Sequence, residues 1–240
     1  MRWLSSLLAL LIVLSAFGQA ARKAVTTTPD TPHLAFVKEF VRELSAVEDI
    51  RASSEAEMKQ DQATQNQTNS SLSSNMIHTS TLYKLELGSE IETLNGMHLS
   101  KPYDFLIPTL TGFYKAKIGV WDQMGIIATK FLETPKPGVD YGSLVAQMSQ
   151  LRARLDFTDQ SIFQVSPAVF MTLLDLKPDS QGHVSHLLIT NAERQELIHE
   201  INADFGSELG QKNESYTVGA ADTLKTYLLK DYKSSDDPWD

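Results

Sequence analysis

The sequence of 240 residues contains no cysteine. This absence excludes disulfide bonds, thiolate zinc sites, iron–sulfur clusters and a thiol nucleophile. Glycine and proline are also scarce, with 12 and 9 residues, which excludes a collagen-like or low-complexity chain. The remaining composition, 42% hydrophobic and 21% charged, is typical of a globular domain.

Acidic residues outnumber basic residues: the chain has 30 Asp and Glu but 21 Lys and Arg, which gives a net charge of −9. We therefore expect no nucleic-acid binding through a general basic surface. Long hydrophobic runs are rare after the N-terminus, because Lys115, Lys117, Asp122 and Lys130 interrupt the most apolar region, residues 105–132. The sequence thus predicts no membrane span in the mature chain.

The first 20 residues have the pattern of a secretory signal peptide. Arg2 gives a positive start, Leu7 to Leu14 form an apolar run, and Gly18 and Ala20 place small residues before a cleavage site. An uncleaved anchor is the alternative, but the run is short against the ~20 apolar residues that a span needs. We expect export to the periplasm or the medium, with a mature chain that begins at Ala21. The lack of disulfides favours a bacterial exterior.

The mature chain divides into a flexible Thr/Pro-rich lead (residues 21–32), a helical domain (33–232) and an acidic tail (233–240). The first helix is predicted from apolar residues at helical spacing, with Glu39, Arg42 and Glu43 on its polar side. Its apolar positions are Phe36, Val37, Phe40, Val41, Leu44 and Val47. The polar stretch 52–74 is either a solvated extension of this helix or a disordered linker.

Five further helical segments follow from periodicity and capping signals. They are predicted near 76–94, 108–133, 140–163, 166–176 and 190–205, and a last helix spans about 216–228. Ser166 and Pro167 are interpreted as the N-cap and first residue of a new helix, and Thr190 and Glu193 as a capping box. Residues 184–189 resemble a short strand without a partner. The pattern predicts an all-α, single-domain bundle of about six helices.

Two histidine patterns are the candidates for a metal site. Glu196 and His199 have the Glu-x-x-His spacing of di-iron bundles, but no second copy exists in the chain. His183 and His186 form a His-x-x-His pair. Together with His199 they would bring three imidazoles together, but only if the loop that carries the pair folds back onto the helix of His199. We interpret these residues as solvated polar side chains. The sequence predicts no metal ligands, no cofactor and no requirement for a structural metal.

Catalytic motifs are absent as well. There is no Gly-x-Ser-x-Gly elbow and no phosphate-binding glycine loop. Phe113, Tyr114 and Trp121 lie at helical spacing and are expected in the core rather than around a cofactor. The sequence therefore favours a non-enzymatic binding or structural module whose partner is a protein or an envelope component. Two alternatives stay open: a metal-dependent enzyme that uses His183, His186 and His199, and an apolar-ligand carrier with a cavity beside the central helix.

The helix predicted near residues 108–133, the central helix, contains glycines at positions where a helix normally disfavours them. Gly112, Ala116 and Gly119 share one helical face, and each interior glycine costs a helix roughly 1 kcal/mol relative to alanine. We expect this strip to be buried at a close helix–helix contact. The alternative is that it lies on a solvated face.

Overall fold

The computed structural model describes residues 31–63, 69–133, 138–175, 180, 186–210 and 215–230. Over these residues the chain is mostly helical, which confirms the predicted all-α bundle. The elements are α2 (Pro32–Ala63), α3 (Asn69–Asn95), η1 (Tyr103–Phe105), α4 (Leu106–Leu132), α5 (Tyr141–Met171), β1 (Leu174–Asp175), β2 (His186–Leu187), α6 (Asn191–Phe205), η2 (Gly206–Glu208) and α7 (Tyr216–Leu229). The predicted signal peptide and acidic tail lie outside the described residues. Among the helices described, none is both long and apolar enough to cross a bilayer.

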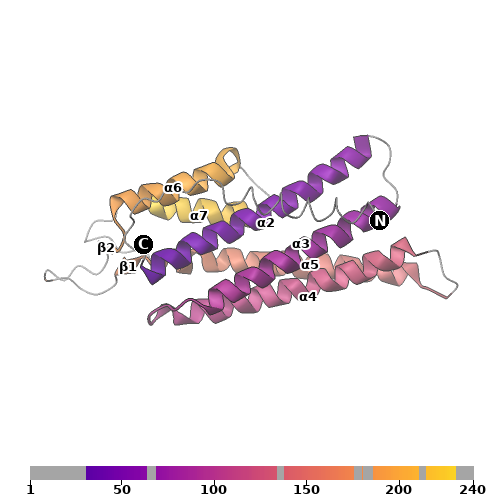
Figure 1. Cartoon of the computed structure of the whole chain (residues 1–240), viewed down its shortest axis with the longest axis horizontal. Helices are drawn as coiled ribbons and strands as arrows, with labels where there is room; N and C mark the ends of the chain where they lie inside the picture. The colour runs from indigo at the N-terminus through magenta and orange to yellow at the C-terminus, as the bar shows by residue number, and fades with distance from the viewer. Residues whose placement is uncertain are drawn as a thin grey trace, which may run out of the picture. The chain divides into compact units, whose positions relative to one another are not determined.

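Helices α3, α4 and α5 lie side by side, and α2 crosses over them (Figure 1). Helices α6 and α7 lie against the N-terminal half of α2, and α7 also packs on α5. The apolar residues predicted for the first helix are all buried here. They join a core that runs through α2 to α7, while a smaller apolar cluster fills the space between α4 and the first half of α5.

Helix α5 runs without interruption from Tyr141 to Met171, so the predicted helix start at Ser166 is wrong. Pro167 lies inside the helix and lacks the N–H that would bond to the carbonyl of Phe163. The Ser166 hydroxyl donates to that same carbonyl, at 2.7 Å. The serine therefore satisfies the acceptor that proline leaves open, and the helix continues through the proline.

The short strand predicted at residues 184–189 does have a partner, contrary to expectation. Strand β2 pairs antiparallel with β1, with Leu174 opposite Leu187 and Asp175 opposite His186. The prediction of a helix over residues 166–176 is therefore also wrong at residues 174–175, which form β1. They leave the helix after Met171, and the Leu188 N–H donates to the Leu173 carbonyl at 2.7 Å.

The capping box predicted at Thr190 and Glu193 is confirmed. The Thr190 hydroxyl accepts the Glu193 N–H, and the Glu193 carboxylate accepts the Thr190 N–H, which completes the capping box of α6. At α5 the Asp140 side chain accepts the Ser143 N–H.

The polar stretch that follows the first helix is helical where the structure describes it. Residues 52–63 extend α2, and residues 69–74 begin α3. Past the α6–α7 pair, α2 continues to Ala63, away from α4 and α5 (Figure 1). Hydrogen bonds tie the two helices there: Thr79 donates to Ser54, Ser54 to Asn75, and Asn75 to Glu57. We call residues 52–63 of α2, together with residues 69–79 of α3, the polar extension.

At the opposite end of the bundle, a single imidazole links three segments of the chain. His33, at the start of α2, lies with Nδ1 2.6 Å from the Thr172 carbonyl and Nε2 2.9 Å from the Ser100 hydroxyl. Because a carbonyl only accepts, Nδ1 donates, and in the neutral ring Nε2 then accepts from Ser100. One side chain thus connects α2, the α3–α4 loop and the end of α5.

Candidate functional site

Charged side chains lie in the interface between α2 and α3. Arg42 of α2 donates to three carboxylates, those of Glu39 at 2.8 Å, Glu86 at 3.0 Å and Glu90 at 2.8 Å. Glu43 lies near the same guanidinium, with 3.9 Å between the ion-pair atoms. Four carboxyl groups therefore surround one arginine, so their charges are only partly balanced.

Glu39 and Glu90 both accept from Arg42, and each of these two carboxyl groups shifts the pKa of the other. Burial raises the pKa of Glu90 to about 9, and the hydrogen bond and charges from Glu39 and Glu43 act in the same direction, against Arg42. Burial also acts to raise the pKa of Glu39, but hydrogen bonds from Arg42 and Glu90 outweigh it and lower that pKa. The proton therefore resides on Glu90 at neutral pH.

Glu43 is the most isolated of these groups. It is 1% exposed, and neither carboxyl oxygen has a hydrogen-bond partner among the described residues. Burial raises its pKa to about 8, as does the charge of Glu86, while Arg42 and Lys117 oppose the shift. At neutral pH most molecules thus carry an uncharged Glu43. The prediction that Glu43 lies on the polar side of this helix, away from the core, is wrong.

Lys117 of α4 is also buried, although it appeared in the sequence only as an interruption of an apolar run. Its side chain is 4% exposed, and Nζ lies 2.6 Å from Oδ1 of Asp159 on α5. The ammonium lies 5.3 Å from the centre of the Tyr83 ring. That ring stacks on Trp121 with 4.4 Å between centroids. Lys117 is therefore held by an ion pair and by the face of an aromatic ring.

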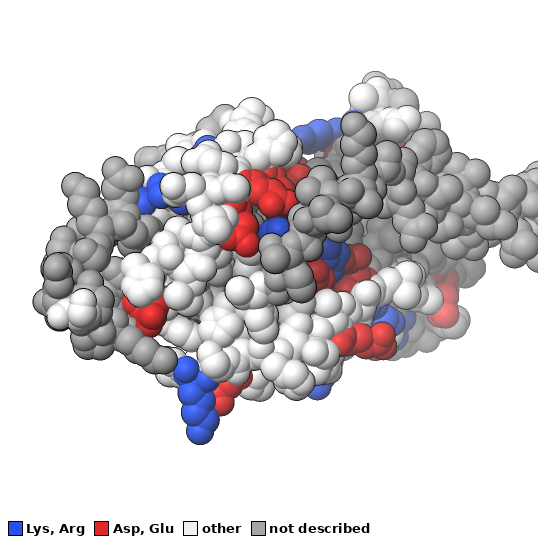
Figure 2. Space-filling view, turned by 60° about the vertical axis from the view of Figure 1, so that its left-hand side comes forward, with Lys and Arg blue, Asp and Glu red and all other residues white. Residues whose placement is uncertain are grey.

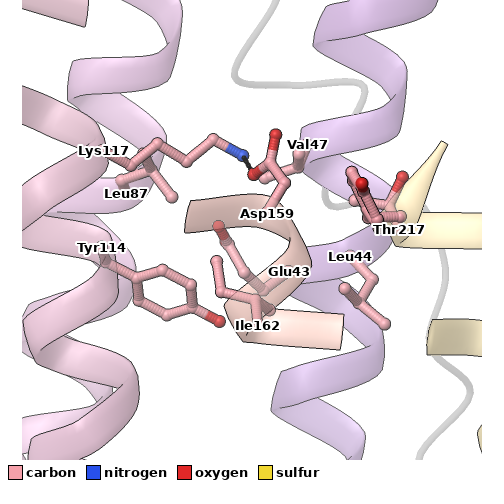
Figure 3. A pocket seen from close by; sticks show the side chains of 10 residues that line it. Glu43, Leu44, Val47, Leu87, Tyr114, Lys117, Asp159, Ile162 and Thr217 are labelled. Carbon is pink, nitrogen blue, oxygen red and sulfur yellow. Dashed lines mark hydrogen bonds and ion pairs between the residues drawn. The ribbon is translucent and has the colours of Figure 1, made fainter. Parts of the chain in front are cut away.

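A cavity of about 20 Å³ lies between these groups. Glu43, Tyr114, Lys117 and Asp159 contribute polar atoms to it, and Leu87 and Ile162 are among its apolar walls (Figure 3). The Tyr114 hydroxyl is buried and has no hydrogen-bond partner among the described residues. The volume admits about one water molecule, far below the ~300–1,000 Å³ of small-molecule sites. This site therefore suits proton transfer or a reaction between its own side chains, not capture of a separate substrate.

Glu48 continues the buried charges along α2 and contacts the start of α7. Its Oε2 accepts hydrogen bonds from the hydroxyls of Ser215, at 2.8 Å, and Thr217, at 2.6 Å. Burial alone raises the pKa of Glu48, but hydrogen bonds from Arg51, Thr217 and Ser215 outweigh it and lower the pKa. The carboxylate is therefore charged and lies at the N-terminus of α7, where the helix dipole favours a negative charge.

Comparison with known proteins finds no family model, no curated protein and no solved structure that matches this chain.

The candidate metal ligands do not form a site in the part of the chain that is described. His183 lies outside it; His186 is 52% exposed and pairs with Asp175 at 3.6 Å; His199 is exposed. Glu196 pairs with Lys38 of α2 at 3.6 Å. The described residues contain no group of three or more His, Cys, Asp or Glu side chains that could hold a metal ion.

The predicted contact strip on the central helix is wrong. Gly112, Ala116 and Gly119 are exposed, and a Cβ added at either glycine would meet no atom within 4 Å. The close contact occurs instead at Gly125, where an added Cβ would lie 2.9 Å from the Ser80 hydroxyl oxygen. The prediction for the aromatic residues of this helix is correct, since Tyr114 is buried and Phe113 and Trp121 pack against the core.

The sequence contained a weak signal for the buried charges. Glu39 and Arg42 have the i, i+3 spacing of an intrahelical ion pair, and Glu86 and Glu90 lie on one face of their own helix. Charged residues at such spacing normally lie on a solvated helix face. Only the packing of α2 on α3 shows that the charged face of one helix contacts the charged face of the other.

Proposed function

We propose that this chain is exported and acts as a non-enzymatic helical interaction module of the cell envelope or exterior. The observation that carries the proposal is the polar extension. No residue of α2 from Ala52 to Ala63 is buried. A helical segment without an apolar face is not stabilised by packing against its own domain. A helical arm of this kind is suited to present side chains to another molecule.

The extension offers a surface on which a partner can bind. An open groove of about 440 Å³ lies between α2 and α3, and its lining is polar, including Glu57, Asn75 and His78. Groups of this kind recognise a polar partner through hydrogen bonds. We infer that the partner is a protein or an envelope component with a polar contact surface.

The charge distribution supports a partner other than nucleic acid. On the face seen in Figure 2, Lys and Arg side chains are separated by acidic and uncharged residues and do not gather into a patch. The net charge of −9 argues in the same direction.

The two alternative functions gain no support from the described residues. The cavity beside Tyr114 has a volume of about 20 Å³, too small for an apolar cargo. His186 and His199, the described members of the histidine set, are exposed and have no third ligand beside them.

Site-specific photo-crosslinking in the cells that make the protein tests the interaction. A photoreactive residue is placed at His78, which is exposed and lines the groove, or at Lys115, which is exposed on α4. We expect one defined protein adduct from position 78 and none from position 115. Equal adducts from both positions, or none from either, would contradict the proposal.

Export is tested separately, by cell fractionation and by the N-terminal peptide of the native protein. A chain that begins at Ala21 in the exported fraction supports it. An intact Met1 on protein retained in the cytoplasm would refute it.

A further inference from the structure

The ion pair between α4 and α5 brings a nucleophile to an electrophile. Lys117 Nζ lies 2.6 Å from Asp159 Oδ1, although the two residues are 42 positions apart. The carboxyl carbon is one carbon–oxygen bond, about 1.2 Å, beyond that oxygen. The nitrogen is therefore close to the ~3–3.5 Å separation from which two bound groups react. Their effective concentration is high because both helices are held in the bundle.

A third group in the same cavity is suited to move protons. Glu43 lines the cavity beside Lys117 and Asp159 (Figure 3), and its two oxygens have no hydrogen-bond partner among the described residues. Burial raises its pKa to about 8, so near neutral pH it both donates and accepts a proton readily. The apolar walls, including Leu87 and Ile162, limit competition from bulk water.

We propose that Lys117 and Asp159 react after folding to form an intramolecular isopeptide bond, with Glu43 as the proton-transfer group. Such a bond links α4 covalently to α5. In a chain without cysteine it supplies the kind of cross-link that disulfides provide elsewhere.

The reaction balances without an oxidant or any other reactant. Within the ion pair, the Lys117 ammonium first gives a proton to the Asp159 carboxylate, which leaves a neutral amine and a carboxylic acid. The amine electron pair then forms a bond to the Asp159 carboxyl carbon. Glu43 gives its proton to the departing hydroxyl and takes one from the nitrogen. The carbon–oxygen bond breaks, and one water molecule leaves past Asp159, which is 28% exposed.

The chain carries its own matched control. Lys84 and Asp122 also join two neighbouring helices, with 2.5 Å between Nζ and Oδ1. Their side chains are 42% and 49% exposed, and neither residue lines the cavity that contains Glu43. If closeness alone sufficed, this pair would react as well. The proposal requires that it does not.

Mass spectrometry of the denatured, full-length protein tests the bond. We expect the wild-type chain to be lighter by one water molecule than its sequence requires, with the N-terminus fixed by peptide mapping. After trypsin digestion, the peptides that contain Lys117 and Asp159 should be found joined, and those that contain Lys84 and Asp122 should not. A wild-type chain of full mass would overturn the proposal, and so would a water loss that maps to other residues.

Two variants complete the test, and denatured mass is readable whether or not they fold well. Lys117→Arg keeps a cation beside Asp159 but lacks the reactive amine, so its mass should be full. Glu43→Gln keeps the side-chain shape and should leave the bond unformed or formed many times more slowly. Normal bond formation in Glu43→Gln would overturn the role given to Glu43.

Discussion

The protonated carboxyl group of Glu90 predicts an unusual dependence of stability on pH. Its pKa is about 9 in the folded protein and near 4.3 in an unfolded chain. Between these values the folded state holds a proton that the unfolded state has released. The contribution of Glu90 is therefore fully present below about pH 4 and is lost as the pH rises through 9. This is the reverse of the usual behaviour of a buried, ion-paired carboxylate.

The magnitude follows from proton linkage. One additional bound proton changes the free energy of unfolding by about 1.4 kcal/mol per pH unit. Between pH 6 and pH 8, Glu90 should thus lower stability by about 2–3 kcal/mol, before other groups are counted. Glu90→Gln mimics the protonated acid, because its amide can donate to Glu39 while its oxygen accepts from Arg42.

Urea denaturation of wild type and Glu90→Gln at several pH values measures the difference. We expect the stability of the variant relative to wild type to increase by about 2–3 kcal/mol between pH 6 and pH 8. Glu92→Gln, an exposed change on the same helix, is the control and should follow wild type. Parallel pH profiles for wild type and Glu90→Gln would refute the argument that Glu90 is protonated.

Three further outcomes test other parts of the structure. Gly119→Ala should raise the free energy of unfolding by up to about 1 kcal/mol, since the position is exposed and helical. Gly125→Ala should lower the free energy of unfolding, because the new Cβ would press on Ser80. Equal effects of the two variants on the thermal midpoint would contradict both assignments. Thr190→Ala removes the cap of α6 and should cost about 1 kcal/mol; an unchanged denaturant midpoint would argue that the capping box is not needed. A chelator should leave the thermal midpoint unchanged, and a large drop would show that a metal is required.

Most of the helices were predictable because their apolar residues follow a simple period. The apolar residues predicted between Phe36 and Val47 are buried as expected, and the capping box at Thr190 marks the true start of α6. The errors arose where a local signal was overruled. Pro167 normally ends a helix, but the hydroxyl of Ser166 supplies the missing donor.

The buried charges could not be predicted, because a single helix does not reveal which of its polar residues face another helix. Glu43 and Lys117 have the sequence context of solvated side chains, and both are buried. Gly112 and Gly119 mislead in the opposite way, because small residues at helical spacing are typical of a close contact and here lie exposed. The distance between Lys117 and Asp159 depends on how α4 and α5 pack, which periodicity does not specify.

The two ends of α2 have different consequences for how the protein opens. Near His33 the helix is fixed to Ser100 and to Thr172, residues 67 and 139 positions away in the chain. Amide protons of the buried residues between Phe36 and Leu44 should exchange with solvent only when the whole domain unfolds. Amides of residues 52–63, none of which is buried, should exchange through local fraying many times faster. One continuous helix would then show a steep gradient of protection, and a partner that binds the polar extension would be detected as slower exchange in its last three turns.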